Sequence, residues 1–323
     1  MSPRAPELRS TLLSVCDSHN GTVDCILLSG GLDTSIFADA GHEILGLKTA
    51  VTVVCGQNQP DEPYATAIAA KRGLDHHIVR LSSPMELVTE GDILNLCVRT
   101  LFTFDPMELR NAVVIAKGLL KCKALGAKSI VTGDGADELF AGYSFMKSMS
   151  PGRLKRYIGR LAVPGVMRFC AGPLGKELGL TVVQPFLDEK VVAIAVKCPK
   201  SALLRETEDG VVHGKYLLRE AFPEALSQWR KKDPIEVGSG TSILPKIFAE
   251  RSNDKLFAAE VQSILEKDQV KIRDPEHLHY YRVFKNTFAI ERRDQFFCVV
   301  CGEWPAREGS LPTDVQDGDD VDQ

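Results

Sequence analysis

The chain has 323 residues, of which 44% are hydrophobic and 25% charged, and it carries a formal net charge of −4 at pH 7. This composition is typical of a globular protein that can bury a large core, and the acidic balance makes a nucleic-acid partner unlikely on electrostatic grounds. No apolar stretch approaches the roughly 20 residues of a membrane helix and no signal-like segment follows Met1, so we expect a soluble, cytoplasmic protein with no membrane partner.

The first half of the chain alternates between short apolar runs and helical segments. Strands are predicted at residues 25–28, 44–54, 76–81 and 129–132, and helices at residues 4–20, 34–40, 63–72, 84–90, 92–101 and 111–125. Strands and helices that alternate so closely form βαβ units, whose strands are parallel. The pattern therefore predicts an α/β fold, a doubly wound parallel sheet.

From Lys147 the alternation stops and a mostly helical, proline-punctuated stretch begins. Since no flexible linker separates the two parts, we expect the helical part to pack on the sheet. We divide the chain into an N-terminal helix (1–20), one domain (21–290) with an α/β core (21–146) and a helical part (147–290), and a C-terminal extension (291–323). The extension ends in an acidic, apolar-poor tail that is predicted to be disordered.

The first candidate site is the loop after the first strand, Leu28-Ser29-Gly30-Gly31-Leu32-Asp33-Thr34-Ser35. Paired glycines let backbone N–H groups approach an anion, and the following helix adds the positive end of its dipole. The hydroxyls of Ser29, Thr34 and Ser35 can donate to phosphate oxygens. Asp33 does not favour a bare phosphate, so we interpret it as a Mg²⁺ ligand facing a nucleotide pyrophosphate. The alternative is an ordinary capped helix, which needs a shorter string.

A second polar loop, Thr132-Gly133-Asp134-Gly135-Ala136-Asp137-Glu138, again follows a strand. In an open parallel sheet, ligands bind beyond the carboxyl ends of the strands, so we expect both loops to face one crevice. Asp33 and Asp137 would then share Mg²⁺ around a triphosphate. Taken alone, Asp137 and Glu138 are equally consistent with charges that complement a helix dipole.

These motifs resemble the asparagine synthetase family within the N-type (PP-loop) ATP pyrophosphatases, which have the adenine nucleotide alpha hydrolase-like (HUP-type) fold. Residues 132–143 are similar to the family's Ser-Gly-Glu-Gly-Ser-Asp-Glu-Leu-Phe-Gly-Gly-Tyr signature, and residues 184–188 to its Val-Pro-Phe-Leu-Asp motif. Further matches follow in the family's order over residues 20–290, at residues 105–110, 215–223, 229–233 and 279–284.

The resemblance implies site residues at the matching positions. Arg110 would grip a carboxylate or phosphate, Asp134 would position or deprotonate the attacking ammonia, and Lys232 would be the catalytic lysine that stabilises phosphate charge. The expected nucleotide-binding residues are Leu28, Ser29, Gly30, Gly31, Asp33, Thr34, Ser35, Thr132, Gly133 and Lys215, and the expected metal ligands are Asp33 and Asp137.

Two departures from the family pattern bear on the nitrogen source. Family members that hydrolyse glutamine begin with a glutaminase domain whose nucleophile is a cysteine at position 2, where this chain has Ser2; Cys16 is no substitute. We therefore expect free ammonia, another amine, or ammonia from a separate glutaminase subunit as the nitrogen source. Asp134 stands where the family has Glu, which shortens the reach of that carboxylate by one methylene.

The resemblance thus implies an ATP-dependent ligase for asparagine biosynthesis that adenylates a carboxylate, the aspartate side chain, and releases AMP and pyrophosphate. ATP and Mg²⁺ are the expected cofactors, and a homodimer is a hypothesis the sequence leaves open. One alternative is a tRNA-modifying pyrophosphatase that adenylates a base, for which Cys298 and Cys301 would be candidate working cysteines. The other is a nucleotide-binding regulator without catalysis, a role that needs no catalytic lysine.

Overall fold

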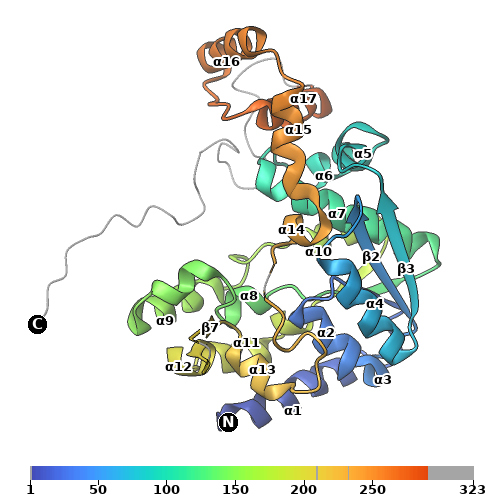
Figure 1. The fold of residues 1–323 in the computed structure, drawn as a ribbon, viewed down its shortest axis with the longest axis vertical. Coiled ribbons are helices and arrows are strands. Elements are labelled where there is room, and N and C mark those ends of the chain that lie inside the picture. The colour runs from blue at the N-terminus through green and yellow to red at the C-terminus, as the bar shows by residue number, and fades with distance from the viewer. Residues whose placement is uncertain (1, 209, 232, 290–323) are drawn as a thin grey trace, which may run out of the picture.

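The computed structural model describes residues 2–208, 210–231 and 233–289. At its centre lies a five-stranded sheet in the order β3-β2-β1-β4-β5, in which every neighbouring pair is parallel. Figure 1 shows two of its strands, β2 and β3, side by side. The strands are β1 (Cys25–Leu27), β2 (Thr49–Cys55), β3 (Asp75–Leu81), β4 (Ser129–Val131) and β5 (Thr181–Val183). A separate two-stranded antiparallel ladder pairs β6 (Arg205–Glu206) with β7 (Val212–His213).

Buried side chains lie on both faces of the sheet, and β1 shows why. Successive residues of a strand point to opposite faces. Cys25 and Leu27 accordingly belong to one hydrophobic cluster, whereas Ile26 and Leu28 belong to the other. Helices therefore cover both faces, and the α/β, doubly wound fold class is confirmed.

The helices divide between the two clusters. The cluster containing Ile26 is built with α1 (Arg4–Asp17), α2 (Leu32–Asp39), α3 (His42–Leu45), α4 (Asp61–Arg72), α8 (Ala136–Leu139), η1 (Ser144–Ser148), α9 (Pro151–Leu161), η2 (Pro185–Leu187), α11 (Glu189–Ala195), α12 (Lys200–Leu203) and α13 (Tyr216–Ala221). The cluster containing Cys25 is built with α5 (Met85–Thr89), α6 (Ile93–Leu101), α7 (Pro106–Ala124), α10 (Ala171–Glu177), α15 (Leu244–Glu250), α16 (Asp254–Asp268) and α17 (Pro275–Thr287). The remaining helical turns are α14 (Ile235–Ser239) and η3 (Thr241–Ile243).

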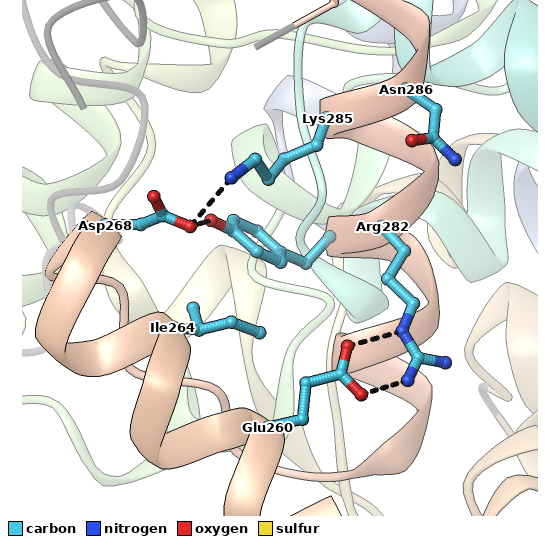
Figure 2. A pocket seen from close by; sticks show the side chains of 7 residues that line it. Glu260, Ile264, Asp268, Arg282, Lys285 and Asn286 are labelled. Carbon is cyan, nitrogen blue, oxygen red and sulfur yellow. Dashed lines mark hydrogen bonds and ion pairs between the residues drawn. The ribbon is translucent and has the colours of Figure 1, made fainter. Parts of the chain in front are cut away.

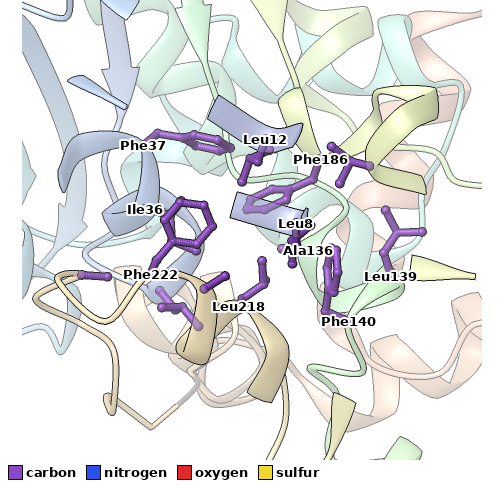
Figure 3. Packing of buried hydrophobic residues seen from close by; sticks show 14 of the residues in the cluster. Leu8, Leu12, Ile36, Phe37, Ala136, Leu139, Phe140, Phe186, Leu218 and Phe222 are labelled. Atoms are coloured by element: carbon purple, nitrogen blue, oxygen red, sulfur yellow. The ribbon is translucent and has the colours of Figure 1, made fainter. Parts of the chain in front are cut away.

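The core around Phe186 joins segments that are far apart in the chain. Figure 3 shows Phe37 of α2, Phe140 and Phe186 packed together with Leu8 and Leu12 of α1. The ring of Phe186 lies 4.9 Å from that of Phe37 and 6.2 Å from that of Phe140, measured between centroids. Because Phe37 and Phe140 follow the two predicted loops, this core holds the bases of both loops in place.

Two corrections to the predicted elements concern the main sheet. Residues 42–45 form the helical turn α3, so β2 begins only at Thr49 and not at Ile44. A fifth parallel strand, β5, lies in the part that was expected to be helical from Lys147 onward. β5 joins the sheet by pairing in parallel with β4, a partner about 50 residues earlier in the chain.

None of the helices that the structure describes combines the length and the apolar character of a membrane span. The boundaries of the N-terminal helix, the domain and the extension remain predictions. The acidic tail lies outside the described residues.

Candidate active site

The two glycine-containing loops leave neighbouring strands at the point where the chain order of the sheet reverses. From β1 the chain builds β2 and β3 on one side, and β4 and β5 on the other. Cys25 and Ile26 of β1 pair in parallel with Ile130 and Val131 of β4, so the loops at residues 28–31 and 132–135 leave the same edge of the sheet. Such a switch point, outside the carboxyl ends of the strands, is where open α/β sheets bind ligands.

The two loops are in direct contact. A Cβ built on Gly133 would lie 2.8 Å from Cβ of Asp33 and 3.3 Å from Cγ2 of Thr34. Any larger residue at position 133 would therefore push the loops apart. The two loops therefore adjoin, through a contact that only glycine allows.

The first loop is packed tightly against α4. Gly30 adopts a φ of +71°, and a Cβ there would lie 2.6 Å from the backbone nitrogen of Ala65. The backbone N–H of Gly31 donates to Oγ of Ser29 at 3.2 Å, and that hydroxyl lies 3.3 Å from Oγ1 of Thr34. Two hydroxyls thus meet at the N-terminus of the eight-residue helix α2, an arrangement suited to phosphate oxygens.

The hydroxyl of Ser35 has a partner within the protein. Its side chain is buried, and its hydroxyl donates to Oδ2 of Asp39 at 3.0 Å. Asp39 also accepts from Nε of Arg72 at 2.8 Å and from the backbone N–H of Leu226 at 2.8 Å. Ser35 therefore fastens the first turn of α2 to the core, and its predicted contact with phosphate stays a prediction.

Lys215 joins the two carboxylates that were predicted to hold the metal. Its Nζ donates to Oδ1 and Oδ2 of Asp33 at 2.8 and 2.6 Å, and lies 2.9 Å from Oδ1 of Asp137. Burial by itself would lower the pKa of this lysine, but the charges of Asp137 and Asp33 outweigh it and raise the pKa. The group is therefore an ammonium shared between two carboxylates.

The backbone around Lys215 is shaped to bring its side chain there. Lys215 has a φ of +54°, and its N–H donates to the carbonyl of Phe140 at 2.9 Å. A Cβ on Gly142 would lie 1.8 Å from Oδ1 of Asp137 and 2.5 Å from Cε of Lys215. The glycine after the second loop is thus what allows the lysine and the aspartate to meet.

Two carboxylates suit Mg²⁺ as donors, because this ion is usually held by one or two protein carboxylates together with phosphates and water. Within residues 2–208, 210–231 and 233–289 no group of three or more His, Cys, Asp or Glu side chains could hold a metal. Lys215 also lies between Asp33 and Asp137. The residues fit Mg²⁺ in donor chemistry, provided that phosphates complete the ligands and the lysine moves off at least one carboxylate.

Asp134 is held by two donors that reach the same oxygen. Oγ1 of Thr132 and Nε2 of Gln184 each donate to Oδ2 of Asp134 at 2.7 Å. Burial raises the pKa of Asp134, and these two hydrogen bonds offset part of the rise. The result is a fixed carboxylate one residue after the contact between the loops, in a place where a general base would be useful.

Arg230 was not singled out from the sequence, yet it holds the first loop. Its Nη1 donates to the carbonyl of Ser29 at 3.2 Å, and its Nη2 donates to Oδ1 of Asp61 at 2.7 Å. The guanidinium also lies over the ring of Tyr64, 4.4 Å from the centroid. The segment 229–233 had been assigned to Lys232 alone, and Lys232 lies outside the described residues, as do Cys298 and Cys301.

Arg110 forms an ion pair within the protein. Its Nε and Nη2 donate to the carboxylate of Glu276 in α17 at 2.8 and 2.6 Å, and Glu276 is fully buried. Tyr280 completes the group by donating to Oε1 of Glu276 at 2.9 Å. Arg110 thus ties α7 to α17, and its predicted role in gripping a substrate stays a prediction.

A polar pocket of about 320 Å³ lies between α16 and α17 (Figure 2). Its charged groups face one another: Arg282 forms a double hydrogen bond with Glu260, and Lys285 donates to Asp268 at 2.9 Å. This pairing fastens the two helices together. The groups do not converge on a common point in the pocket, so it makes a poor candidate for the active site.

The fold and these contacts define a class: a doubly wound α/β domain with two glycine loops in contact at its switch point. The chain belongs to the asparagine synthase family, because the family model described as "Asparagine synthase" matches residues 22–171 and 174–285.

Curated relatives agree with this assignment. The chain is 26% identical over 259 residues to asparagine synthetase [glutamine-hydrolyzing] 1 of Arabidopsis thaliana, which covers 72% of this chain and 43% of that protein. It is 27% identical over 275 residues to asparagine synthetase B [glutamine-hydrolyzing] of Escherichia coli (strain K12), covering 77% and 48% respectively. The chain therefore spans less than half the length of these relatives.

Among solved structures, NMN synthetase from Francisella tularensis aligns with 72% of this chain and 99% of its own, at 14% identity and a TM-score of 0.29.

Proposed function

We propose that the chain is an ATP-dependent, AMP-forming amide ligase that adenylates the side-chain carboxylate of aspartate and transfers it to ammonia, giving asparagine. The proposal is carried by one observation: in a member of the asparagine synthase family, Asp33, Asp137, Lys215 and the fixed carboxylate of Asp134 adjoin one loop contact at the switch point. ATP and the amino acid are the substrates on this proposal.

In the first step a carboxylate oxygen of aspartate attacks the α-phosphorus of ATP, and the bond from that phosphorus to the β-phosphate oxygen breaks. The hydroxyls of Ser29 and Thr34, together with the N-terminus of α2, would hold the departing pyrophosphate. The ammonium of Lys215 is close enough to Asp33 to exchange a carboxylate partner for a phosphate oxygen. Lys232 would stabilise charge on the phosphates, as the resemblance implies.

Mg²⁺ bound by Asp33 and Asp137 would neutralise charge on the pyrophosphate leaving group. This protein's own contribution is to hold those carboxylates at a fixed separation, which Gly142 and Gly133 permit by lacking side chains. Arg230 supports the site from behind the first loop by binding the carbonyl of Ser29.

In the second step the nitrogen of ammonia attacks the acyl carbon, the bond between that carbon and the oxygen of AMP breaks, and the extra proton of the nitrogen is lost. Asp134, with its pKa raised by burial, is the group we assign to orient the nitrogen and to receive the proton. A separate glutaminase subunit as the source of ammonia, a homodimeric state and a cytoplasmic location are further parts of the proposal.

The test is the release of pyrophosphate from ATP by the purified chain, with aspartate and ammonium each present or omitted, followed by mass analysis of the products. We expect equal amounts of AMP, pyrophosphate and asparagine, with glutamine unable to replace ammonium. Asp33→Asn should reduce turnover at least about a hundredfold, since it removes one of the two carboxylates at the pyrophosphate. If the complete mixture gives no pyrophosphate and no asparagine, the proposal is refuted.

A further inference from the structure

Two positions at which the chain differs from the family motifs meet in the structure. Asp134 stands in place of Glu, and Gln184 in place of the Val that begins the Val-Pro-Phe-Leu-Asp motif. They are 50 residues apart in the chain, yet Nε2 of Gln184 donates to Oδ2 of Asp134 at 2.7 Å. The strand β5, which the sequence did not predict, ends at Val183 and so delivers Gln184 to the loop that follows β4.

We propose that Gln184 is a positioning residue for the amine nucleophile: it locks the shortened carboxylate of Asp134 so that this group receives an N–H donor. The inference rests on the proposed function and deepens it, because it assigns the site of the second substrate. Gln184 acts through Asp134, because the orientation of its amide fixes the orientation of that carboxylate.

The geometry supports this role because both donors reach one oxygen. Thr132 and Gln184 each donate to Oδ2 of Asp134, which fixes the rotation of the carboxylate and directs Oδ1 to a different partner. An aspartate lacks one methylene of the family glutamate, so it reaches less far and depends more on being held. Small errors in position are costly for a reacting pair.

The amide of Gln184 uses its nitrogen for the carboxylate, so its Oε1 points elsewhere, and a Cβ on Gly172 would lie 3.7 Å from that oxygen. The carboxylate of Asp134 is a hydrogen-bond acceptor, which favours a nucleophile with N–H bonds, such as ammonia or a primary amine. Once the C–N bond forms and AMP leaves, the proton of the nitrogen passes to Asp134.

The ionisable groups around Asp134 are consistent with an amine site. Cys170, at the start of α10, lies near both Asp134 and Glu108 of α7, whose negative charges help to raise the pKa of its thiol. Arg168 is a cation beside Glu108, so Asp134 is the carboxylate that is left to bind an amine.

The test separates the two half-reactions. Exchange of labelled pyrophosphate into ATP, dependent on aspartate and without ammonium, reports adenylation; the KM for ammonium in asparagine formation reports the second step. For Gln184→Val we expect exchange within about twofold of wild type and a KM for ammonium raised about tenfold or more, the effect of losing a hydrogen bond to a charged group. Gln262→Val, in exposed helix α16, is the matched control and should change neither.

Rescue distinguishes positioning from simple damage. Asp134→Glu combined with Gln184→Val restores the family pair, and we expect the double variant to recover most of the loss that either single variant shows. Two results would overturn the inference when the wild-type protein does catalyse exchange. One is an unchanged KM for ammonium in Gln184→Val, and the other is a double variant that is no more active than the worse single variant. Wild-type protein without aspartate-dependent exchange would overturn the proposed function itself.

Discussion

Lys215 is the residue on which the charge balance of the site depends. It is buried, has a positive φ, and shares one ammonium between Asp33 and Asp137. Two carboxylates this close would repel each other strongly in partly buried surroundings, so the lysine stabilises them in the absence of another cation. The same contacts mean that a metal ion and Lys215 compete for the carboxylates.

Replacing Lys215 by Met should therefore improve metal binding to the nucleotide-free protein. We expect the affinity for Mn²⁺ to rise at least about tenfold, as measured from the electron paramagnetic resonance signal of free Mn²⁺. A tenfold change is about 1.4 kcal/mol, which is a modest part of the Coulomb energy between the lysine and the two carboxylates. Lys71→Met is the control, because Lys71 lies 3.1 Å from the buried Asp39, away from the pair. Equal Mn²⁺ affinity in wild type and Lys215→Met would contradict the competition.

Asp39 provides a prediction about pH and stability. Burial by itself raises the pKa of Asp39, but hydrogen bonds from Leu226, Arg72, Lys71 and Ser35 outweigh it and hold the pKa below 3.8. A carboxyl whose native pKa is lowered stabilises the fold above its unfolded pKa and loses that contribution as the pH falls through the native value.

For Asp39→Asn we expect a loss of about 2 kcal/mol in the free energy of unfolding at neutral pH, the size of charge-assisted hydrogen bonds. Urea titrations at a series of pH values should show the difference from wild type shrinking as the pH falls below 3.8, the ordinary pKa of the group. A difference that stays constant down to the acid limit of folding would show that the charge is not responsible. Asp75→Asn, an exposed aspartate, should lose little at any pH.

At the scale of elements, the conformation of the first loop is fixed by contacts with α4 and with the segment 226–230. A Cβ on Gly30 would lie 2.6 Å from the backbone of α4 at Ala65, and Ser227 donates to the carbonyl of Gly30 at 2.5 Å. Arg230 donates to the carbonyl of the preceding residue, Ser29. The loop is thus held in place by the protein itself, which on the proposed function would lower the entropic cost of binding phosphates.

Gly30→Ala tests that rigidity, with Gly73→Ala as its control. Both glycines have positive φ, +71° and +64°, so both variants bear a similar backbone strain, but nothing lies within 4 Å of a Cβ at Gly73. Calorimetric titration with ATP should show affinity lost by more than about tenfold in Gly30→Ala alone. Both variants should lose roughly 1 kcal/mol of the free energy of unfolding, because alanine is strained at a positive φ. ATP affinity unchanged in Gly30→Ala would refute the role given to the loop.

Most of the sheet and both loops could be predicted from the sequence because their signals are local. The strings around Gly30 and Gly133 follow apolar runs directly, so strand, loop and helix can be identified within a dozen residues. The rest depends on pairing at long range. β5 is a strand through its partner β4, and Arg110 meets Glu276 across 166 positions. Arg230 reaches Ser29 across 201 positions.

At the scale of the whole molecule, the order β3-β2-β1-β4-β5 makes the site possible. It places the reversal of the sheet between β1 and β4, so that two loops more than 100 residues apart in the chain touch. The shared core of α1, α2 and Phe186 then fixes both loops on a single foundation. Family membership says what such a site is used for among relatives, and the contacts of Asp33, Asp137, Lys215 and Asp134 motivate the same chemistry here.

The central claim is that the carboxylate attacks the α-phosphorus of ATP, and oxygen labelling tests it most directly. The purified chain would be incubated with ATP, ammonium and aspartate, with ¹⁸O in the side-chain carboxylate of the aspartate. The mass of the nucleotide product would then be measured by mass spectrometry. Passage through an acyl-adenylate predicts AMP with one ¹⁸O atom per molecule and unlabelled pyrophosphate. ADP together with ¹⁸O in inorganic phosphate, or AMP without label, would contradict the account.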